Sequence, residues 1–409
     1  MTILEINNYF SIRGGSETAL FETVEALEGR GHCVVPFAMR HPKNVPNEYD
    51  AYFPNPAPRW QFWKRLYNRD VARALERLIV DVKPDVAHLH NIAYQLTPAV
   101  IAVLRRRGIP MVQTLHDYQA VSALPLLYSR GEIFETNHWG SALRIVFQRA
   151  YKGALVASVA AVVHTMIDRL FGFTRSVHRF LAPSLFVANM ATRYGLPEEH
   201  VVFLPQSQEV HDACRDSDPR SYFLFFGRLS DEKGVGELIE RWAHVSKEQT
   251  LLVVGAGPAE AALRRLARAR GIENIRWFGA CENREMLHRI IERARAVLVP
   301  SQWYENAPYT VLEAFAHATP VIASDIGGLP ELVDETRGWL VDPESVVGWT
   351  AAIRAVAEHP EEARRRGETA RQWLLNTRSR VDYGSELESV LYKAIACVGS
   401  PEWCAAQLV

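Results

Sequence analysis

Residues 294–331 constrain the fold more than any other part of this 409-residue chain. Residues 296–299 and 320–323 are short apolar runs rich in β-formers, and a helical pattern lies between them. Two strands joined by a helix predict a βαβ unit and therefore a parallel sheet. Ligands bind such sheets at the carboxyl ends of the strands, where the polar loops 301–307 and 324–328 would lie. The segment thus predicts a fold class and a binding site.

Two glutamates in this segment, Glu305 and Glu313, are too far apart to meet on one helix. An unbroken helix would place them two turns apart and roughly 80° around its axis. Pro308 fits the first turn of a helix, which leaves Glu305 in the preceding loop and Glu313 inside the helix. A helix that begins near Tyr309 offers free backbone N–H groups that suit a phosphate. Because carboxylates accept hydrogen bonds from sugar hydroxyls, the combination predicts a nucleotide-sugar site.

This segment resembles the E-x7-E signature of the retaining family 4 glycosyltransferases of GT-B fold. The sequence E-N-A-P-Y-T-V-L-E at 305–313 carries the resemblance, together with P-V-I-A-S at 320–324 and G-G-L-P-E at 327–331. Thr319 departs from the pattern, because relatives usually carry Gly before this Pro. The resemblance implies that Glu305 holds the transferred sugar and Glu313 the ribose. It places four further residues in the donor site: Asn306, Ala307, Tyr309 and Thr310.

A second motif follows an apolar strand predicted at 222–226. Arg228 and Lys233 stand on the loop after it, and an arginine fork with a lysine point charge suits a diphosphate. Residues 227–234 match the motif G-R-L-x-x-x-K-G of the same family at every fixed position. The resemblance implies that both cations act in catalysis by stabilising the leaving diphosphate. It also places the nucleotide base beside the loop at Ala280, where main chain makes the contacts.

The first half of the chain offers weaker signals. Gly14 and Gly15 lie between a predicted strand and a helix whose N-cap we expect at Ser16. The resemblance implies a loop that faces the donor phosphates and the acceptor, and the alternative is a tight turn that needs positive φ.

Histidines form a further pattern in this half. The resemblance assigns to His116, at a strand end, a hydrogen bond to a sugar hydroxyl and a part in shaping the catalytic pocket. His88 and His90 share one face of a strand, which permits, as an alternative, a metal site with His116 or Asp117.

The length of the chain predicts two or three domains. The resemblance implies an α/β fold of GT-B type, with two facing Rossmann-like domains of doubly wound parallel sheet and a cleft for donor and acceptor. We predict an acceptor-side domain over 1–207, a charged linker over 208–220 and a nucleotide-sugar-binding domain over 221–375. A C-terminal helix within about 376–409 is expected to cross back onto the first domain.

Composition limits the partners and the location of the protein. Hydrophobic residues make up 48% and charged residues 23%, which is typical of a soluble globular protein, and the net charge of −1 predicts no nucleic-acid binding. Five scattered cysteines and a start without a secretory signal predict a cytoplasmic protein. An aromatic, basic helix predicted at 60–67 would either line an acceptor groove or contact the inner face of the membrane, and simple packing is its alternative.

The implied activity is transfer of a sugar, in the manner of a hexosyltransferase, from a nucleotide-diphosphate sugar such as a UDP- or GDP-sugar to an acceptor hydroxyl. The acceptor would be a saccharide, a glycolipid or a small molecule, in glycan, polysaccharide or glycolipid biosynthesis. We expect no cofactor besides this donor, and no metal, because no cluster of carboxylates at metal spacing accompanies the diphosphate site. The alternatives are a non-catalytic sugar-nucleotide or saccharide binding protein of the same fold, and a sugar-nucleotide epimerase or hydrolase.

Overall fold

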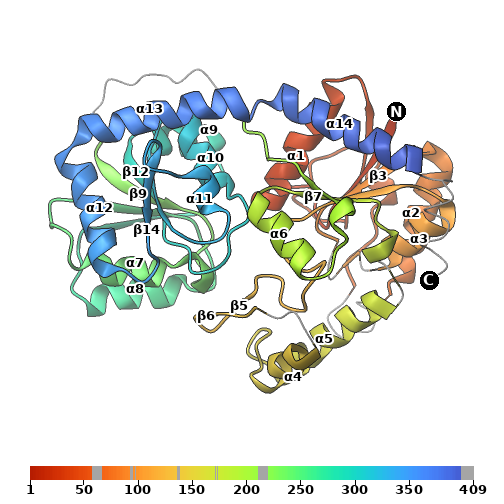
Figure 1. The fold of residues 1–409 in the computed structure, drawn as a ribbon, viewed down its shortest axis with the longest axis horizontal. Helices are drawn as coiled ribbons and strands as arrows, with labels where there is room; N and C mark the ends of the chain where they lie inside the picture. Colours follow the sequence, from red (N-terminus) through yellow and green to blue (C-terminus); the bar gives the residue numbers. More distant parts are fainter. Residues whose placement is uncertain are drawn as a thin grey trace. The chain divides into compact units, whose positions relative to one another are not determined.

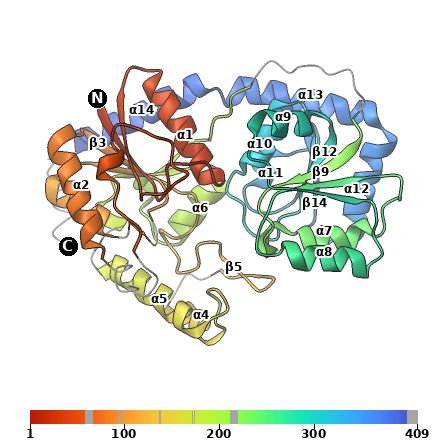
Figure 2. The same ribbon diagram turned by 180° about the vertical axis from the view of Figure 1, so that it is seen from behind.

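The computed structural model describes residues 1–57, 67–92, 95, 96, 98–135, 139–170, 172, 174–210 and 220–397, with the side chains of 139–141 and 168–170 excepted. The chain divides into two compact α/β units (Figures 1 and 2). Unit 1 comprises Met1–Leu127, Glu135–Gln206 and Arg380–Val409, and unit 2 comprises Tyr128–Phe134 and Ser207–Ser379. Residues 60–66 of the predicted aromatic helix and 211–219 of the predicted linker lie outside the described residues.

Unit 1 is built on a six-stranded parallel sheet with the strand order β2-β1-β3-β4-β7-β8. Its strands are β1 (Thr2–Ile6), β2 (Cys33–Phe37), β3 (Val86–Leu89), β4 (Met111–Thr114), β7 (Arg179–Ala182) and β8 (Val201–Phe203). Its helices are α1 (Gly15–Glu28), α2 (Arg69–Val82), α3 (Ala99–Arg107), α4 (Trp139–Phe147), α5 (Leu155–Leu170), α6 (Leu185–Arg193) and α14 (Arg380–Cys397), with the 3-10 turns Asp50–Tyr52, Thr174–Ser176 and Glu198–His200.

Helices cover both faces of this sheet. Successive residues of a strand point to opposite sides of the sheet, so each strand contributes apolar side chains to both faces. Leu4 and Ile6 of β1 are buried in a cluster with side chains of α2 and α3. Ile3 is buried in a different cluster, with side chains of α1 and α14. The strands therefore read as continuous apolar runs, as expected for a doubly wound sheet.

Unit 2 repeats this architecture with the strand order β11-β10-β9-β12-β13-β14, and every pair in its six-stranded sheet is parallel. Its strands are β9 (Tyr222–Phe226), β10 (Leu251–Val254), β11 (Ile275–Gly279), β12 (Ala294–Val299), β13 (Val321–Ser324) and β14 (Gly338–Val341). Its helices are α7 (Val235–Trp242), α8 (Glu260–Ala269), α9 (Arg284–Glu292), α10 (Tyr309–Ala316), α11 (Leu329–Leu332), α12 (Val346–Glu358) and α13 (Pro360–Thr377), with a 3-10 turn over Asp231–Lys233. The antiparallel hairpin of β5 (Tyr128–Ser129) and β6 (Glu132–Ile133) also belongs to unit 2.

The C-terminal helices belong to different units, as the GT-B resemblance implies. Helix α13 is part of unit 2, whereas α14 is part of unit 1, where it packs along α1. Arg380 contacts Glu22 at 3.0 Å, and the hydroxyls of Tyr383 and Thr23 lie 2.7 Å apart. The predicted α/β fold of GT-B type, including the helix that returns to the first domain, is therefore confirmed.

At α1 the predicted N-cap is wrong, and so is the alternative of a tight turn with positive φ. The N-cap is Gly14 rather than Ser16, and no side chain caps this helix. Gly14 has φ −178°, and Gly15 is the first residue of the helix, so neither glycine serves a turn with positive φ. Both are exposed at the carboxyl end of β1.

Candidate functional site

The strand order of each sheet identifies one edge as the place for a ligand. In open α/β sheets ligands bind beyond the carboxyl ends of the strands, where the strand order changes direction. In unit 2 this point lies between β9 and β12, and in unit 1 it lies between β1 and β3. The predicted residues Arg228, Lys233 and Glu305 follow β9 and β12, so the topology of unit 2 brings them to one edge.

Glu305 is the centre of the unit 2 site. Its carboxylate is almost fully buried, with 4% of the side chain exposed, and its Oε1 atom accepts from Lys233 Nζ at 2.7 Å and from Ser301 Oγ at 2.6 Å. Its other oxygen, Oε2, has no hydrogen-bond partner among the described residues. A carboxylate oxygen with spare acceptor capacity is suited to a hydroxyl group of a ligand.

Close backbone contacts between loops fix the position of Glu305. Gly234 follows Lys233 with φ +69°, and a Cβ there would lie 1.8 Å from the carbonyl oxygen of Pro300. Gly327 also has positive φ, and a Cβ there would lie 2.6 Å from the carbonyl oxygen of Glu305, which accepts from Gly328 N at 2.7 Å. Only glycine permits these approaches. The glycines of the motifs K-G (233–234) and G-G (327–328) therefore allow the loops after β9, β12 and β13 to pack closely around Glu305.

Arg228 is held by one edge of its guanidinium group. Its Nη2 atom donates to Glu232 at 2.6 Å and its Nε atom donates to Ser230 at 3.2 Å, while 62% of the side chain is exposed. Burial alone would raise the pKa of Glu232, but hydrogen bonds from Ser230 and Arg228 lower it below its usual value. Glu232 is therefore a carboxylate that orients Arg228.

Helix α10 begins at Tyr309, as the sequence predicts, but Pro308 lies just before the first turn and not within it. Pro308 is the N-cap in an extended conformation, so it precedes the first turn of α10, in which Tyr309 and Thr310 stand. Glu313 lies inside α10 with 13% of its side chain exposed, 3.7 Å from Arg284. The predicted placement of Glu305 in a loop and of Glu313 in the helix is confirmed.

Three more predicted residues lie at the same edge of the sheet. Asn306 and Ala307 are buried in the loop between β12 and α10. Ala280 is exposed in the loop after β11, beyond the strands that carry Arg228 and Glu305.

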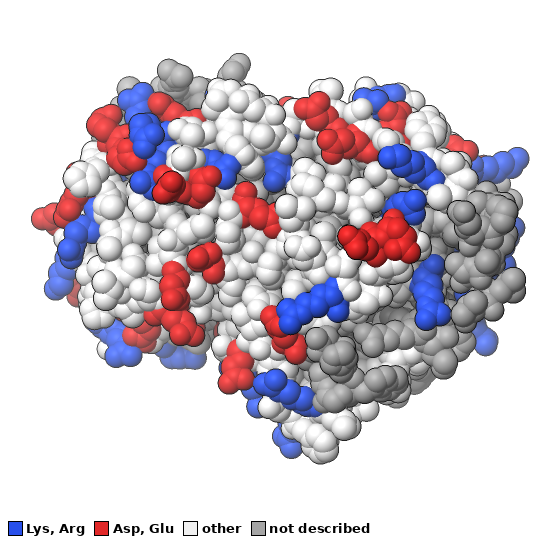
Figure 3. Space-filling view, viewed as in Figure 1, with Lys and Arg blue, Asp and Glu red and all other residues white. Residues whose placement is uncertain are grey.

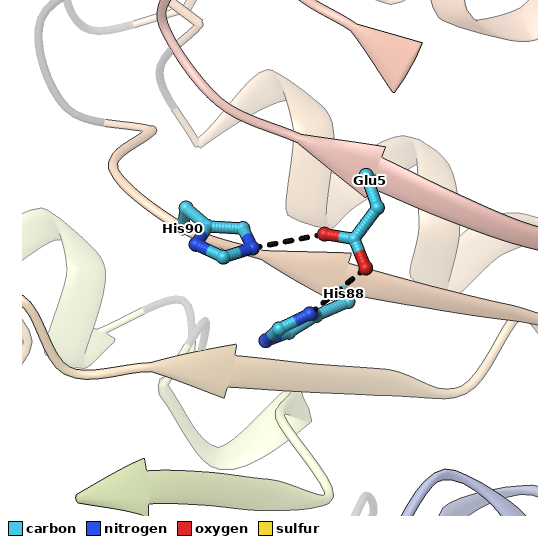
Figure 4. A group of neighbouring side chains, drawn as sticks. All are labelled: Glu5, His88 and His90. Atoms are coloured by element: carbon cyan, nitrogen blue, oxygen red, sulfur yellow. Dashed lines mark hydrogen bonds and ion pairs between the residues drawn. The ribbon is translucent and has the colours of Figure 1, made fainter. Parts of the chain in front are cut away.

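The unit 1 edge holds a buried carboxylate between two imidazoles (Figure 4). Glu5 on β1 lies 3.0 Å from His88 Nδ1 through Oε1 and 2.9 Å from His90 Nε2 through Oε2. These three residues are fully buried. Burial raises the pKa of Glu5, but the charges and hydrogen bonds of His88 and His90 outweigh it and lower the pKa to about 2. Glu5 is therefore ionised, and both imidazoles donate to it.

Hydrogen bonds extend this group in two directions. His88 Nε2 lies 2.8 Å from Thr114 Oγ1, and His90 Nδ1 lies 2.9 Å from His116 Nε2. Because a neutral His90 donates from Nε2 to Glu5, its Nδ1 atom must accept, and His116 must donate from Nε2. Burial, with the neighbouring His90 and His88, holds the pKa of His116 well below its usual range. His116 is therefore a neutral imidazole whose Nδ1 atom is an acceptor.

A cavity of about 80 Å³ lies beside His116. His90, Asn91, Thr114, His116 and Asp117 are among the residues that line it. Burial raises the pKa of Asp117 to about 6. The cavity thus offers a neutral imidazole and a carboxyl group that protonates near pH 6, a combination that suits uncharged hydroxyl groups.

The residues whose geometry would permit a metal ion differ from the predicted set, which was His88 and His90 with His116 or Asp117. The potential ligand atoms of Glu5, His88 and His90 lie within 4.8 Å of one another. His116 instead hydrogen-bonds to His90, and Asp117 accepts from Gln119 N. The cavity is lined by His90 but not by Glu5 or His88. Since N–H protons already join these groups, the geometry is that of a hydrogen-bond network.

Sequence reasoning missed Glu5, Thr114 and Ser301. Glu5 had a signal, because it is the only charged residue in the apolar strand Thr2–Ile6. A carboxylate in a buried strand needs partners in the fold. Ser301 and Thr114 carry no comparable signal, since hydroxyl residues at strand ends are common.

The two doubly wound units, each with polar side chains beyond the strands where the order reverses, define an α/β protein of the GT-B class. The model of "Glycosyltransferase Family 4" matches residues 13–206, and that of "Glycosyl transferases group 1" matches residues 191–373. Together they span most of the chain. The chain belongs to glycosyltransferase family 4.

Similar proteins include two bacterial enzymes. Glycogen synthase of Mycobacterium tuberculosis is 29% identical over 304 residues, which cover 71% of this chain but only 64% of that protein. O-antigen chain mannosyltransferase C of Escherichia coli is 29% identical over 49% of this chain and 56% of that protein. The chain therefore matches less than two thirds of the length of these relatives.

Solved structures share the fold over nearly the whole chain. Sucrose-phosphate synthase from Thermosynechococcus elongatus has a TM-score of 0.74 at 19% identity, covering 97% of this chain and 99% of that one. HepE from Anabaena, in complex with UDP and glucose, has a TM-score of 0.70 at 15% identity and covers 96% of this chain and 100% of that one.

Proposed function

We propose that this chain is a retaining glycosyltransferase of hexosyltransferase type, which moves a sugar from a nucleotide-diphosphate sugar to an acceptor hydroxyl. The position of Glu305 carries the proposal. Its buried carboxylate is paired with Lys233 on one oxygen and retains acceptor capacity on the other. An ammonium group for a diphosphate and a carboxylate for sugar hydroxyls thus stand 2.7 Å apart at the ligand-binding edge of the sheet.

Each predicted residue has a distinct role in this proposal. Lys233, Arg228 and the first backbone N–H groups of α10, at Tyr309 and Thr310, stabilise the diphosphate as its charge develops on departure. Glu305 holds hydroxyls of the transferred sugar, and Glu313 holds the ribose.

The remaining assignments complete the donor and acceptor sites. Asn306 and Ala307 line the donor site, and Ala280 contacts the base through main chain. In unit 1, His116 accepts from a sugar hydroxyl through Nδ1, and Gly14 and Gly15 form a loop for phosphates and acceptor. The proposed donor is a UDP- or GDP-hexose, and the complex of HepE with UDP and glucose supports this class of ligand.

We assign no metal ion to the diphosphate site. The buried carboxylates of Glu305 and Glu232 are each already paired with a cation. Fixed cations and a helix N-terminus can supply the charge stabilisation that a divalent ion supplies elsewhere.

Product analysis tests the proposal. The full chain is incubated with a panel of UDP- and GDP-hexoses, with and without saccharide acceptors, and products are identified by mass spectrometry and by NMR of the anomeric proton. We expect a glycosylated acceptor of retained configuration and free nucleoside diphosphate. Free sugar formed without an acceptor would indicate a hydrolase, an altered donor an epimerase, and binding without any product a non-catalytic binding protein.

A further inference from the structure

The loop after β4 carries an acidic side chain that has no cation beside it. Asp117 stands three residues beyond β4, at the ligand-binding edge of unit 1, and it lines the cavity beside His116. Its Oδ1 atom accepts from Gln119 N at 2.9 Å, and its Oδ2 atom has no hydrogen-bond partner among the described residues. The described residues that line the cavity include no arginine, lysine or glutamate. Asp117 therefore has one carboxylate oxygen to spare and no counter-charge in the cavity.

The fold does not need the charge of Asp117. The hydrogen bond from Gln119 N closes a turn that an asparagine side chain closes equally well. Burial raises the pKa of Asp117 to about 6, so its ionisation at pH 7 weakens the fold instead of stabilising it. A carboxyl group that is retained in a cavity at such a cost is a candidate for a functional role.

The other walls of the cavity suit a saccharide. The side-chain amides of Gln113 and Gln119 can both donate and accept hydrogen bonds, and Ile92 and Ile101 add apolar surface. A sugar ring presents hydroxyls around its rim and C–H groups on its faces, so it matches both kinds of wall. An ammonium group matches them less well, because it only donates hydrogen bonds.

The charge of the whole protein cannot select among ligands of this cavity. The net charge is −1, and acidic and basic side chains are interspersed on the described part of the face that Figure 3 shows. A broad field of one sign, which would attract or repel charged ligands, is therefore absent from that part of the surface. Discrimination by charge must come from the groups that line the cavity, and Asp117 supplies their negative charge.

We propose that Asp117 selects uncharged saccharides as acceptors by binding one of their hydroxyls in this cavity. The Oδ2 atom accepts from the hydroxyl, and the same carboxylate repels an acceptor that carries a carboxylate or phosphate group at this place. Asp117 is thus a specificity residue, and His116 beside it keeps its separate role. This inference rests on the proposed sugar transfer, because only a transferase needs an acceptor.

Transfer to matched neutral and anionic acceptors tests this inference. The full chain is assayed with the UDP- or GDP-hexose that raises its melting temperature most. The acceptors are the methyl glycosides of glucose, galactose and mannose and those of the corresponding uronic acids, which differ only in a carboxylate at C5. We expect kcat/KM of the parent to be at least about tenfold higher for the neutral glycosides, because like charges repel in a partly buried site.

Asp117→Asn removes the charge and keeps the turn. The KM for the neutral acceptors should rise about tenfold, because a charged hydrogen bond becomes a neutral one, while kcat changes little. The preference over the uronic acids should fall about tenfold, and thermal unfolding should occur at or above the temperature of the parent. Glu28→Gln is the matched control, because it removes an exposed carboxylate at the last residue of α1, away from the ligand-binding edge. It should leave KM and preference unchanged.

Several results would overturn the inference alone. These are an Asp117→Asn variant with the parent's KM for neutral acceptors, equal transfer by the parent to neutral and anionic acceptors, and an Asp117→Asn variant that unfolds well below the parent. Methyl glucosaminide is added as a cationic acceptor, and its preference over methyl glucoside would show that the carboxylate pairs with an amine instead. Absence of product with every acceptor would refute the proposed transfer itself, and the role of Asp117 with it.

Discussion

At the ligand-binding edge of unit 1 the buried carboxylate of Glu5 accepts from two imidazoles, whereas at the same edge of unit 2 the buried carboxylate of Glu305 is paired with the ammonium of Lys233. Both sheets are parallel and doubly wound, and both carboxylates lie beside the point where the strand order reverses. The topology is therefore shared, while the chemistry of the side chains differs.

The difference lies in what each edge can bind. Glu5 fixes the imidazoles of His88 and His90 through hydrogen bonds, and the neutral His116, which bonds to His90, suits uncharged hydroxyls. Lys233 and Arg228 instead present full positive charges, of which Arg228 is largely exposed. A parallel sheet thus determines where polar groups gather, and the loop residues determine whether they hold a neutral group or an anion.

Removal of the unit 2 cations should have the largest effect. Arg228→Ala and Lys233→Ala should each lower the rate of transfer 10²–10³-fold, about 2.7–4 kcal/mol, if they stabilise the leaving diphosphate. Lys233→Ala should also lower the free energy of unfolding, because it leaves Glu305 buried without its cation. Steady-state kinetics and urea unfolding measure both quantities.

A double variant sharpens this separation of roles. Lys233→Ala with Glu305→Gln should recover most of the lost stability, since no buried charge remains, but none of the activity. Lys247→Ala, an exposed lysine between α7 and β10, should leave both unchanged. Full transfer activity in Arg228→Ala and Lys233→Ala would refute the proposed role of these cations.

Substitution of Glu5 should act on stability through pH. The folded pKa of about 2 lies below the usual 4.5, so the ionised Glu5 stabilises the fold above pH 4.5 and this contribution is lost as pH falls from 4.5 to 2. Glu5→Gln should therefore lower the free energy of unfolding by roughly 3 kcal/mol at pH 7, with a difference that shrinks in acid.

Urea unfolding at several pH values measures this difference. Glu25→Gln on α1 is the control, because its carboxylate is 55% exposed and should matter little. Histidine ¹⁵N NMR adds a readout of position, since the parent should show His116 protonated on Nε2 and Glu5→Gln should lose this single tautomer. A tautomer unchanged in the variant would mean that Glu5 does not orient His116.

The two glutamates of unit 2 should differ in what they bind. Glu313→Gln should weaken binding of the free nucleoside diphosphate about tenfold, because a charged hydrogen bond to the ribose is lost. Glu305→Gln should leave that affinity nearly unchanged and slow transfer. Isothermal titration with the nucleotide distinguishes them, and parental affinity in Glu313→Gln would exclude the ribose assignment.

The smallest expected effect is that of chelation. If Arg228, Lys233 and α10 supply the charge that stabilises the diphosphate, excess EDTA should leave the rate of transfer unchanged. Assays with EDTA, and then with added Mg²⁺ or Mn²⁺, test this. Complete loss in EDTA that either metal restores would assign the charge to a metal ion.

Local pattern determined the elements of this protein. Apolar runs of four or five residues predicted the strands around 222–226, 296–299 and 320–323, and the structure has β9, β12 and β13 there. The position of Pro308 was enough to separate Glu305 in its loop from Glu313 in its helix. These features depend on residues close in sequence, so periodicity and backbone preference suffice to predict them.

Some local details still depended on the surroundings. Thr319 stands where relatives usually carry glycine, yet it is Ala318 that adopts positive φ, at +51°. The Thr319 side chain is buried and donates to the carbonyl oxygen of Ile291 at 2.9 Å. The turn is thus built with a different left-handed residue, which the sequence pattern alone did not indicate.

The tertiary structure alone decided which polar groups meet. Lys233 and Glu305 are 72 residues apart, and Glu5 and His88 are 83 residues apart. Each pair forms because its strands are neighbours: β9 lies beside β12, and β1 lies beside β3. The strand order in turn depends on how the helices cover both faces of each sheet. The sequence by itself determined the GT-B elements and the residues of the unit 2 motifs. The partners of Glu5 depend on packing between distant segments, which no local pattern encodes.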